Sequence, residues 1–478
     1  MLLKLIIIFL LILFIAFYNV TPNIMDSDVM LVILIVLLLS TILFFTRNEK
    51  INALKGQFLK HSNLVVLGLL IVHFQMYADF ILGYTGMSDS FIWVNESIVI
   101  KSMTLATIGL LCFYLGFLSY NKDFKRNGGK RIKPQYEYIS VKFLMYISTL
   151  VLLIYFATVN PKYIMGHYGA VQKGAIATYM SLLFNLLIFG VIIQSCRNLF
   201  ARNKIPKNFI EYTRFMGFHL LLVLGIYLLS VLISGDRGPL ITFGLCYISG
   251  YFFLTKRKLS FTKGVMLFSV GALIITILGV ARSFDKNLDF NQKINNAVFH
   301  SENEENSILP STKELAVSIR TLHYSVNYIS QGNELLYGRF QYQHIMASLP
   351  FSYIFNALIF EDTSFKFKGP ASFVTWIHQG DFRTYGIGTS AMVDFYLDFG
   401  LMGVIFGMFI FGFFIRFAEV NFYSYSYLNL FSHIFIIVYL CNAIYISRSS
   451  VLFGFRTVVW ILILLLINKY IFNKKLTK

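Results

Sequence analysis

The chain has 478 residues, of which 57% are hydrophobic, 13% are charged and 50 are phenylalanine. A soluble domain carries about 25% charged residues, so this composition excludes an ordinary water-soluble protein and indicates that most of the chain is surrounded by lipid. The net charge of +18 does not indicate nucleic-acid binding, because the basic residues lie in short loops between apolar runs and no nucleic-acid-binding motif is present.

Apolar runs long enough to cross a bilayer recur along the chain. Only helices and closed barrels satisfy their backbone polar groups in lipid, and a barrel would show short alternating segments, which this sequence lacks. Since a helix needs about 20 apolar residues to span the hydrocarbon layer, the sequence predicts an all-α, polytopic bundle of about 12 transmembrane helices. The predicted spans are residues 3–20, 29–45, 63–84, 103–120, 143–159, 178–196, 216–234, 240–255, 264–283, 400–417, 429–446 and 455–472.

The loops between these spans alternate in charge. Lys and Arg cluster after the second, fourth, sixth and eighth spans and again at the end of the chain, whereas the intervening short loops hold few basic residues or none. Basic loops stay in the cytoplasm. The alternation therefore predicts that both termini are cytoplasmic.

One segment, residues 285–399, is polar enough to leave the bilayer, and the alternation places it on the outer side. The predicted organisation is therefore 1–284 with spans one to nine, 285–399 as a large extracytoplasmic loop, and 400–478 with the last three spans.

The large loop is predicted to contain an amphipathic helix. Ser311 followed by Glu314 is typical of a capping box. Apolar residues then recur at spacings of three and four, at Leu315, Ile319, Leu322, Val326 and Ile329. This stripe predicts a helix that lies on the outer membrane surface or packs against the bundle. A second apolar stretch, 345–360, is interrupted by Pro350 and is interpreted as a re-entrant or interfacial segment.

Four arginines lie on the predicted outer side, where the charge rule expects few basic residues. They are Arg237 in a tight turn between two spans, Arg282 at the end of the ninth span, Arg339 in the large loop and Arg448 between the last two spans. Guanidinium groups bind phosphate through two parallel hydrogen bonds, so we predict that these arginines are catalytic and hold a diphosphate. The alternative is that each pairs with lipid headgroups or a carboxylate, as Asp236 with Arg237.

Other polar residues of the loop give weaker signals. His323 lies beside Arg320 on the amphipathic helix, off its apolar stripe, and is the best candidate for a catalytic general base. An ordinary interfacial histidine is the alternative. The residues predicted to bind substrate are Arg320 and three residues just before the tenth span, Asp394, Tyr396 and Asp398.

No metal and no cofactor are predicted. The histidines of the loop lack a metal-ligand spacing, and no phosphate-binding glycine loop is present. Asp26 and Asp28 occupy the first outer loop, where acidic residues of some membrane glycosyltransferases bind a metal. Asp28 is interpreted instead as the cap of the second span.

Three segments resemble Wzy-type polymerases of oligosaccharide repeat units, the enzymes of O-antigen and capsular polysaccharide synthesis. Residues 385–403 are similar to the segment by which that family enters a late span. The turn 234–238 resembles its arginine-bearing turn, and Gly338–Arg339–Phe340 resembles part of its loop. The span count and the late outer loop agree, so the resemblance covers most of the chain. Asp236 is a departure, because relatives often have a small or hydroxyl residue there.

The resemblance implies a membrane glycosyltransferase of the bacterial cytoplasmic (inner) membrane that builds a surface polysaccharide without a cofactor. An acceptor sugar hydroxyl attacks the anomeric carbon of a donor chain, and polyprenyl diphosphate leaves. The implied partners are polyprenyl-diphosphate-linked oligosaccharide and membrane lipids, with a chain-length regulator and a flippase as candidates. The alternatives are an O-antigen ligase, another lipid-linked-sugar glycosyltransferase, or a transporter of lipid-linked oligosaccharides. A transporter should show inverted repeats, which are not evident here.

Overall fold

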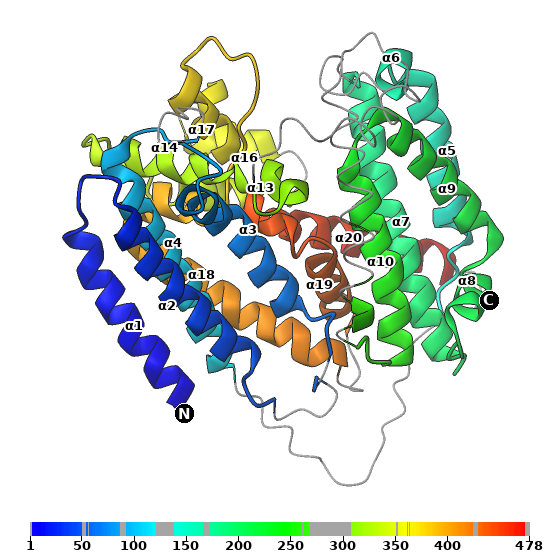
Figure 1. The fold of residues 1–478 in the computed structure, drawn as a ribbon. Helices are drawn as coiled ribbons and strands as arrows, with labels where there is room; N and C mark the ends of the chain where they lie inside the picture. Colours follow the sequence, from blue (N-terminus) through cyan, green and yellow to red (C-terminus); the bar gives the residue numbers. More distant parts are fainter. Residues whose placement is uncertain are drawn as a thin grey trace.

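The computed structural model describes residues 2–49, 54–55, 57–86, 92–120, 138–165, 173–260, 262–264, 266, 271, 307–349, 352–360, 362, 364–423 and 429–473. Within these ranges the chain forms helices and connecting turns, with no strand (Figure 1). The all-α class predicted from the apolar runs is therefore confirmed.

The first four helices form one group with a helix from late in the chain. The members are α1 (Leu2–Asn19), α2 (Ser27–Phe45), α3 (His61–Ile81), α4 (Glu96–Ser119) and α18 (Val393–Tyr423). Helix α4 lies at the centre, because it contacts the other four and most of its residues are buried. Two glycines bring α4 and α18 into backbone contact, since a Cβ on Gly116 would overlap Phe409 and one on Gly412 would overlap Phe113. Small residues permit this close approach of membrane helices.

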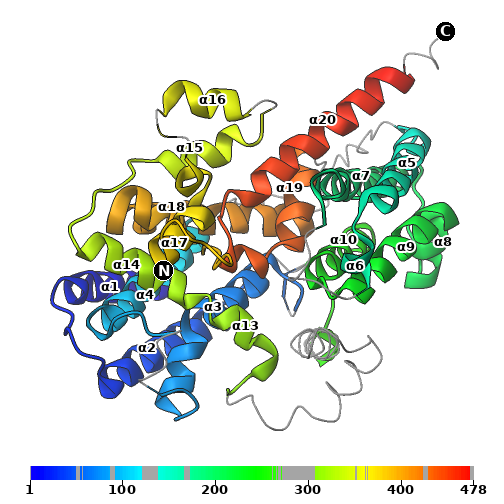
Figure 2. The same ribbon diagram turned by 90° about the horizontal axis from the view of Figure 1, so that it is seen from above.

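A second group is formed by consecutive helices from the middle of the chain. The members are α5 (Lys142–Thr158), the short α6 (Pro161–Ile164), α7 (Ala175–Ala201), α8 (Phe209–Met216), α9 (Phe218–Ser234) and α10 (Arg237–Thr255). Two C-terminal helices, α19 (Leu430–Cys441) and α20 (Phe453–Asn473), join the groups: α19 contacts α10 and α18, and α20 contacts α7 and α19. Figure 2 shows α19 and the start of α20 between the two groups.

Eight of the described helices are long and apolar enough to cross a membrane, or nine if α8 and α9, which meet at an angle of 96°, count as one span. Helices α5 and α19 are apolar but shorter. The predicted ninth span, 264–283, lies almost entirely outside the described residues. The prediction of about 12 spans is therefore not confirmed, although each of the other predicted spans coincides with a helix.

Short helices gather at one end of the molecule, which we call the loop face (Figures 1 and 2). They are η2 (Pro310–Thr312), α13 (Lys313–Ala316), α14 (Ile319–Ser330), α15 (Arg339–Met346), α16 (Ser352–Ile359), η3 (Phe365–Phe367) and α17 (Pro370–Gln379). Helix α6 lies at the same end in Figure 1.

The predicted amphipathic helix is present but divided. It breaks at Val317–Ser318 into α13 and α14, and the residue that precedes α13, Thr312, makes no side-chain capping bond. On α14 the stripe residues Ile319, Leu322 and Val326 are fully buried and Ile329 is partly buried, and the helix packs against α4, α17 and α18. Of the two alternatives, the helix therefore packs against the bundle.

Two further boundaries differ from the prediction. Helix α18 begins at Val393, seven residues before the predicted span, and is broken at Gly400, where φ is 62° and ψ is −148°. A side chain at such dihedral angles would be strained, so glycine permits the break. At α2 the capping residue is Asp26, not Asp28: its carboxylate accepts from the amides of Asp28 at 2.8 Å and Val29 at 3.2 Å.

Candidate active site

Two predicted site residues, Arg320 on α14 and Arg448 on η4 (Tyr445–Arg448), lie on the loop face and influence each other electrostatically. Arg320 is buried, and its guanidinium carbon lies 5.9 Å from the centre of the Tyr385 ring. Arg448 Nη1 lies 3.7 Å from Glu314 Oε1, and both side chains are partly exposed. Burial lowers the pKa of Arg320, and the positive charge of Arg448 lowers it further. Because like charges repel, an anion bound between the two guanidinium groups would be stabilised by both.

Arg339, the first residue of α15, lies among aromatic rings. Its guanidinium carbon is 3.7 Å from the centre of the Phe367 ring and 4.5 Å from that of Phe360, and Nη2 donates to the carbonyl of Asp362. No carboxylate of the described residues lies within ion-pair distance of this guanidinium. Aromatic faces stabilise a cation without neutralising it; burial lowers the pKa of Arg339, and the charge of Asp362 raises it.

Two carboxylates on the first two turns of α18 attach α15 to the bundle. Asp398 is fully buried and accepts hydrogen bonds from the amides of Phe340 at 3.1 Å and Gln341 at 2.9 Å, which lie in the first turn of α15. Asp394, also buried, accepts from Thr389 Oγ1 at 2.6 Å and lies 3.1 Å from His344 Nε2. These two predicted substrate-binding residues therefore act on the protein itself, one through backbone amides and one through an imidazole ring.

His323 and Tyr396 lie away from these groups. His323 was expected off the apolar stripe, but it is fully buried, with its Nε2 2.8 Å from Tyr77 Oη and its Nδ1 3.3 Å from the carbonyl of Ile92. Burial lowers the pKa of His323 to about 4. Tyr396 is buried between α1 and α18, with its hydroxyl 3.0 Å from Tyr18 Oη. Both side chains are therefore buried and bonded inside the protein.

The turn that carries Arg237 forms as predicted. Helix α9 ends at Gly235, which adopts the left-handed conformation with φ 83°, and Asp236 caps α10, whose first residue is Arg237. The side chain of Arg237 is not described. Asp236, the suggested partner of Arg237, accepts from Lys173 Nζ at 3.1 Å and Tyr163 Oη at 3.3 Å.

Arg237 therefore begins a helix of the second group, whereas Arg320, Arg339 and Arg448 lie on the loop helices and η4. Arg282 lies outside the described residues, so the structure does not relate it to the other arginines. Within the described part of the chain, no group of three or more His, Cys, Asp or Glu side chains could hold a metal ion.

Sequence reasoning missed the pairing of His344 with Asp394. The two residues are 50 positions apart and lie on different helices, so no helical or strand spacing in the sequence could have revealed the pair. The sequence drew attention to this region only through the motif 385–390, in which Thr389 donates a hydrogen bond to the Asp394 carboxylate.

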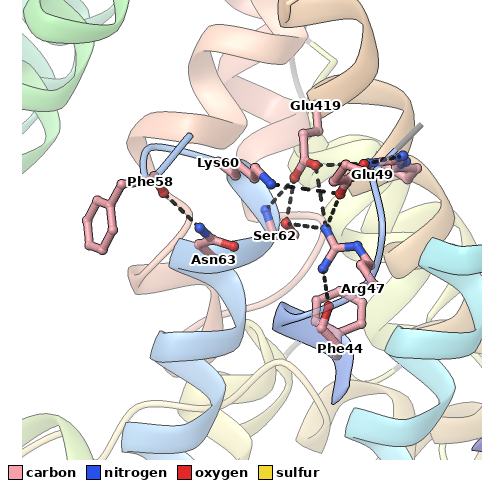
Figure 3. A network of polar contacts seen from close by, with 9 residues as sticks. Phe44, Arg47, Glu49, Phe58, Lys60, Ser62, Asn63 and Glu419 are labelled. Atoms are coloured by element: carbon pink, nitrogen blue, oxygen red, sulfur yellow. Dashed lines mark hydrogen bonds and ion pairs between the residues drawn. The ribbon is translucent and has the colours of Figure 1, made fainter. Parts of the chain in front are cut away.

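A second polar network, at the opposite end of the helices, was also missed (Figure 3). Glu419, fully buried on α18, accepts from Ser62 Oγ at 2.6 Å and from Arg416 Nη1 at 3.0 Å. Glu49 lies 2.9 Å from both Arg47 and Arg416. Lys60 Nζ lies 3.8 Å from Glu49. From the sequence, Arg47 and Lys60 were two loop residues of the charge pattern, but the structure buries them in an ion cluster that joins α2, α3 and α18.

A family model described as O-antigen polysaccharide polymerase Wzy matches residues 2–478, which is essentially the whole chain. No curated protein and no solved structure matches the chain.

Proposed function

The chain belongs to the O-antigen polysaccharide polymerase Wzy family and is therefore an integral membrane polymerase of oligosaccharide repeat units. We propose which lipid-linked sugars serve as the donor and the acceptor of its reaction. In this proposal the donor chain is attached to polyprenyl diphosphate and the acceptor is a single lipid-linked repeat unit. The acceptor hydroxyl attacks the anomeric carbon of the donor, and polyprenyl diphosphate leaves. A flippase that delivers the repeat units and a regulator of chain length are the proposed partners.

The observation that carries the proposal is the electrostatic interaction between Arg320 and Arg448 on the loop face. The leaving diphosphate develops negative charge as the glycosidic bond breaks, and fixed positive groups stabilise that charge most in the transition state. Arg339, held by aromatic rings, supplies a third guanidinium on the same face. No metal is needed in this scheme, because guanidinium groups provide the charge.

We further propose that the loop face lies on the outer side of the cytoplasmic membrane and that both termini are cytoplasmic. The support is the alternation of basic loops. All four native cysteines are buried, so an introduced cysteine can be labelled selectively. Phe382 is 94% exposed on the loop face, and Ile205 is 55% exposed after α7. In intact spheroplasts, Phe382→Cys should react with an impermeant maleimide and Ile205→Cys only after permeabilisation. The reverse pattern would contradict the orientation.

The catalytic proposal is tested with purified protein in liposomes and a defined polyprenyl-diphosphate-linked repeat unit. Arg448→Ala should slow polymer formation about 100-fold, a typical loss for one charge-stabilising donor. Arg448→Lys should retain part of the rate, because the charge remains but the two-pronged hydrogen bonding is lost. The matched control is Arg202→Ala: Arg202 follows α7 at the opposite end and stacks on Tyr138 at 4.0 Å. Wild-type rates from both Arg448 variants would refute the role.

A further inference from the structure

His344 and Asp394 form a buried carboxylate–imidazole pair on the loop face. The distance between His344 Nε2 and Asp394 Oδ2 is 3.1 Å. The Asp394 side chain is 1% exposed, whereas the His344 side chain is 17% exposed. The carboxylate is thus enclosed by protein, and the ring lies between it and the surface.

The hydrogen bonds determine which ring nitrogen is available. Asp394 Oδ1 accepts from the hydroxyl of Thr389 at 2.6 Å, which fixes the carboxylate and leaves Oδ2 for the imidazole. A carboxylate can only accept, so His344 Nε2 carries the hydrogen of that bond and Nδ1 of the neutral ring keeps its lone pair. Among the described residues no hydrogen bond is made to this Nδ1. The arrangement holds one tautomer and directs a basic nitrogen away from the carboxylate.

The pair lies next to the elements that carry the arginines. Helix α15, which bears His344, packs against both α18 and α20. The segment between Thr389 and Asp394 is bonded to η4, because the amide of Ala391 donates to the carbonyl of Ser447 at 3.3 Å. Arg448 is the next residue along η4. The His344 imidazole is therefore bonded to Asp394, and the backbone just before Asp394 is bonded to Ser447, the residue that precedes Arg448.

The other described histidines of the loop lack these features. Both ring nitrogens of His323 already have partners inside the protein. His378 Nε2 lies 2.9 Å from Tyr385 Oη, and burial together with the charge of Arg320 lowers the pKa of His378. Neither ring is paired with a carboxylate that would stabilise its protonated form.

We propose that His344 is the general base of the polymerisation reaction and that Asp394 is its positioning residue. His344 Nδ1 takes the proton of the acceptor hydroxyl while that oxygen bonds to the anomeric carbon of the donor. The bond from the anomeric carbon to the diphosphate oxygen breaks, and its electron pair leaves with polyprenyl diphosphate. The proton then passes from His344 to water or to the departing diphosphate. This assignment rests on the proposed function and names the base that it requires.

The test uses the full-length protein in liposomes with the lipid-linked repeat unit. His344→Ala should lower kcat at least about 100-fold, as expected for loss of a general base. Its affinity for polyprenyl diphosphate should remain within about 2-fold of wild type, because the arginines that bind it are retained. Added imidazole should restore part of the rate of His344→Ala, since a small base can enter the space left by the ring. A merely structural histidine would not be rescued in this way.

Asp394→Asn should lower kcat about 10-fold or more with little change in KM, because the ring stays but loses its fixed tautomer. The matched control is His378→Gln, which replaces a histidine of the same face and should retain most of the wild-type rate. Full activity of His344→Ala, or an inactive His344→Ala that imidazole does not rescue, would overturn the assignment. Failure of the proposed function gives a different result, because wild-type protein would then make no polymer from this substrate.

Discussion

The buried ion cluster of Figure 3 leads to a quantitative prediction for Glu419→Gln. The cluster contains three cations and two carboxylates, so its net charge is +1; the members are Arg47, Lys60, Arg416, Glu49 and Glu419. The substitution preserves the shape of the side chain but raises the net charge to +2. Glu419 Oε1 accepts from Arg416 and Oε2 accepts from Ser62, and the substitution replaces one of these two acceptors with an NH2 group that can only donate.

The size of the effect follows from burial. Glu419 has no exposed surface, and the side chains of Arg47 and Arg416 are 8% and 14% exposed. Removing one partner of a buried ion pair typically costs about 3–5 kcal/mol, because the remaining charge stays desolvated. Since the cluster keeps Glu49 as a second carboxylate, we expect the lower end, a loss of about 3 kcal/mol in the free energy of unfolding.

The measurement is an unfolding titration of purified protein in mixed micelles, followed by tryptophan fluorescence. Glu334→Gln is the control, because Glu334 is an exposed glutamate of the loop face and its substitution should change stability by less than about 0.5 kcal/mol. Adding Arg416→Gln to Glu419→Gln returns the net charge to +1 and should recover part of the loss. If Glu419→Gln is within about 1 kcal/mol of wild type, the cluster does not stabilise this end of the bundle as argued.

Three further results are expected. Gly412→Ala should destabilise the protein by about 1–3 kcal/mol, because the added methyl group overlaps the backbone of Phe113, whereas Gly225→Ala meets nothing within 4 Å and should not. Burial lowers the pKa of His323 to about 4, so the unfolded chain takes up the proton of this histidine at a higher pH than the folded protein does. The free energy of unfolding should therefore fall by about 2 kcal/mol as the pH drops from 7 to 5. His323→Gln should remove that part of the fall in unfolding titrations. Arg237→Ala and Arg237→Lys should both shorten the polymer in cells lacking the native gene, and full-length polymer from both would exclude a role for this arginine.

The sequence predicted the helices well because their signal is local. An apolar run of the length of a bilayer has few other structures available, so α1 to α4 could be recognised from composition alone. The tight turn at Gly235 was predictable for a similar reason, because the glycine lies in a short polar stretch between two apolar runs. The structure shows this glycine in the left-handed conformation. The break at Gly400 was missed, because the predicted span begins at residue 400, whereas the helix starts at Val393 and includes Asp394 and Asp398 before the break.

The candidate site was only partly predictable, because its contacts join distant segments. Four arginines were visible as exceptions to a charge rule, and the charge of one of them, Arg448, acts on Arg320, which the sequence offered only as a substrate-binding residue. By contrast, the contacts of Asp394 and Asp398 with α15 depend on how the loop folds back on α18. His323 was misjudged for the same reason: a helical stripe defines one apolar face, but α14 is covered on more than one side, by α3, α4, α17 and α18.

The break at Gly400 separates the candidate site from the long part of α18. Residues 393–399 are bonded to α15 through both carboxylates, and the neighbouring Ala391 is bonded to η4. Because η4 also packs against α3 of the bundle, these bonds hold the His344 imidazole and the Arg448 guanidinium in a fixed relation to each other and to the bundle. A growing polysaccharide must slide out after each round of addition, and such an attachment would keep the spacing between the proposed proton acceptor and the leaving group constant from one round to the next.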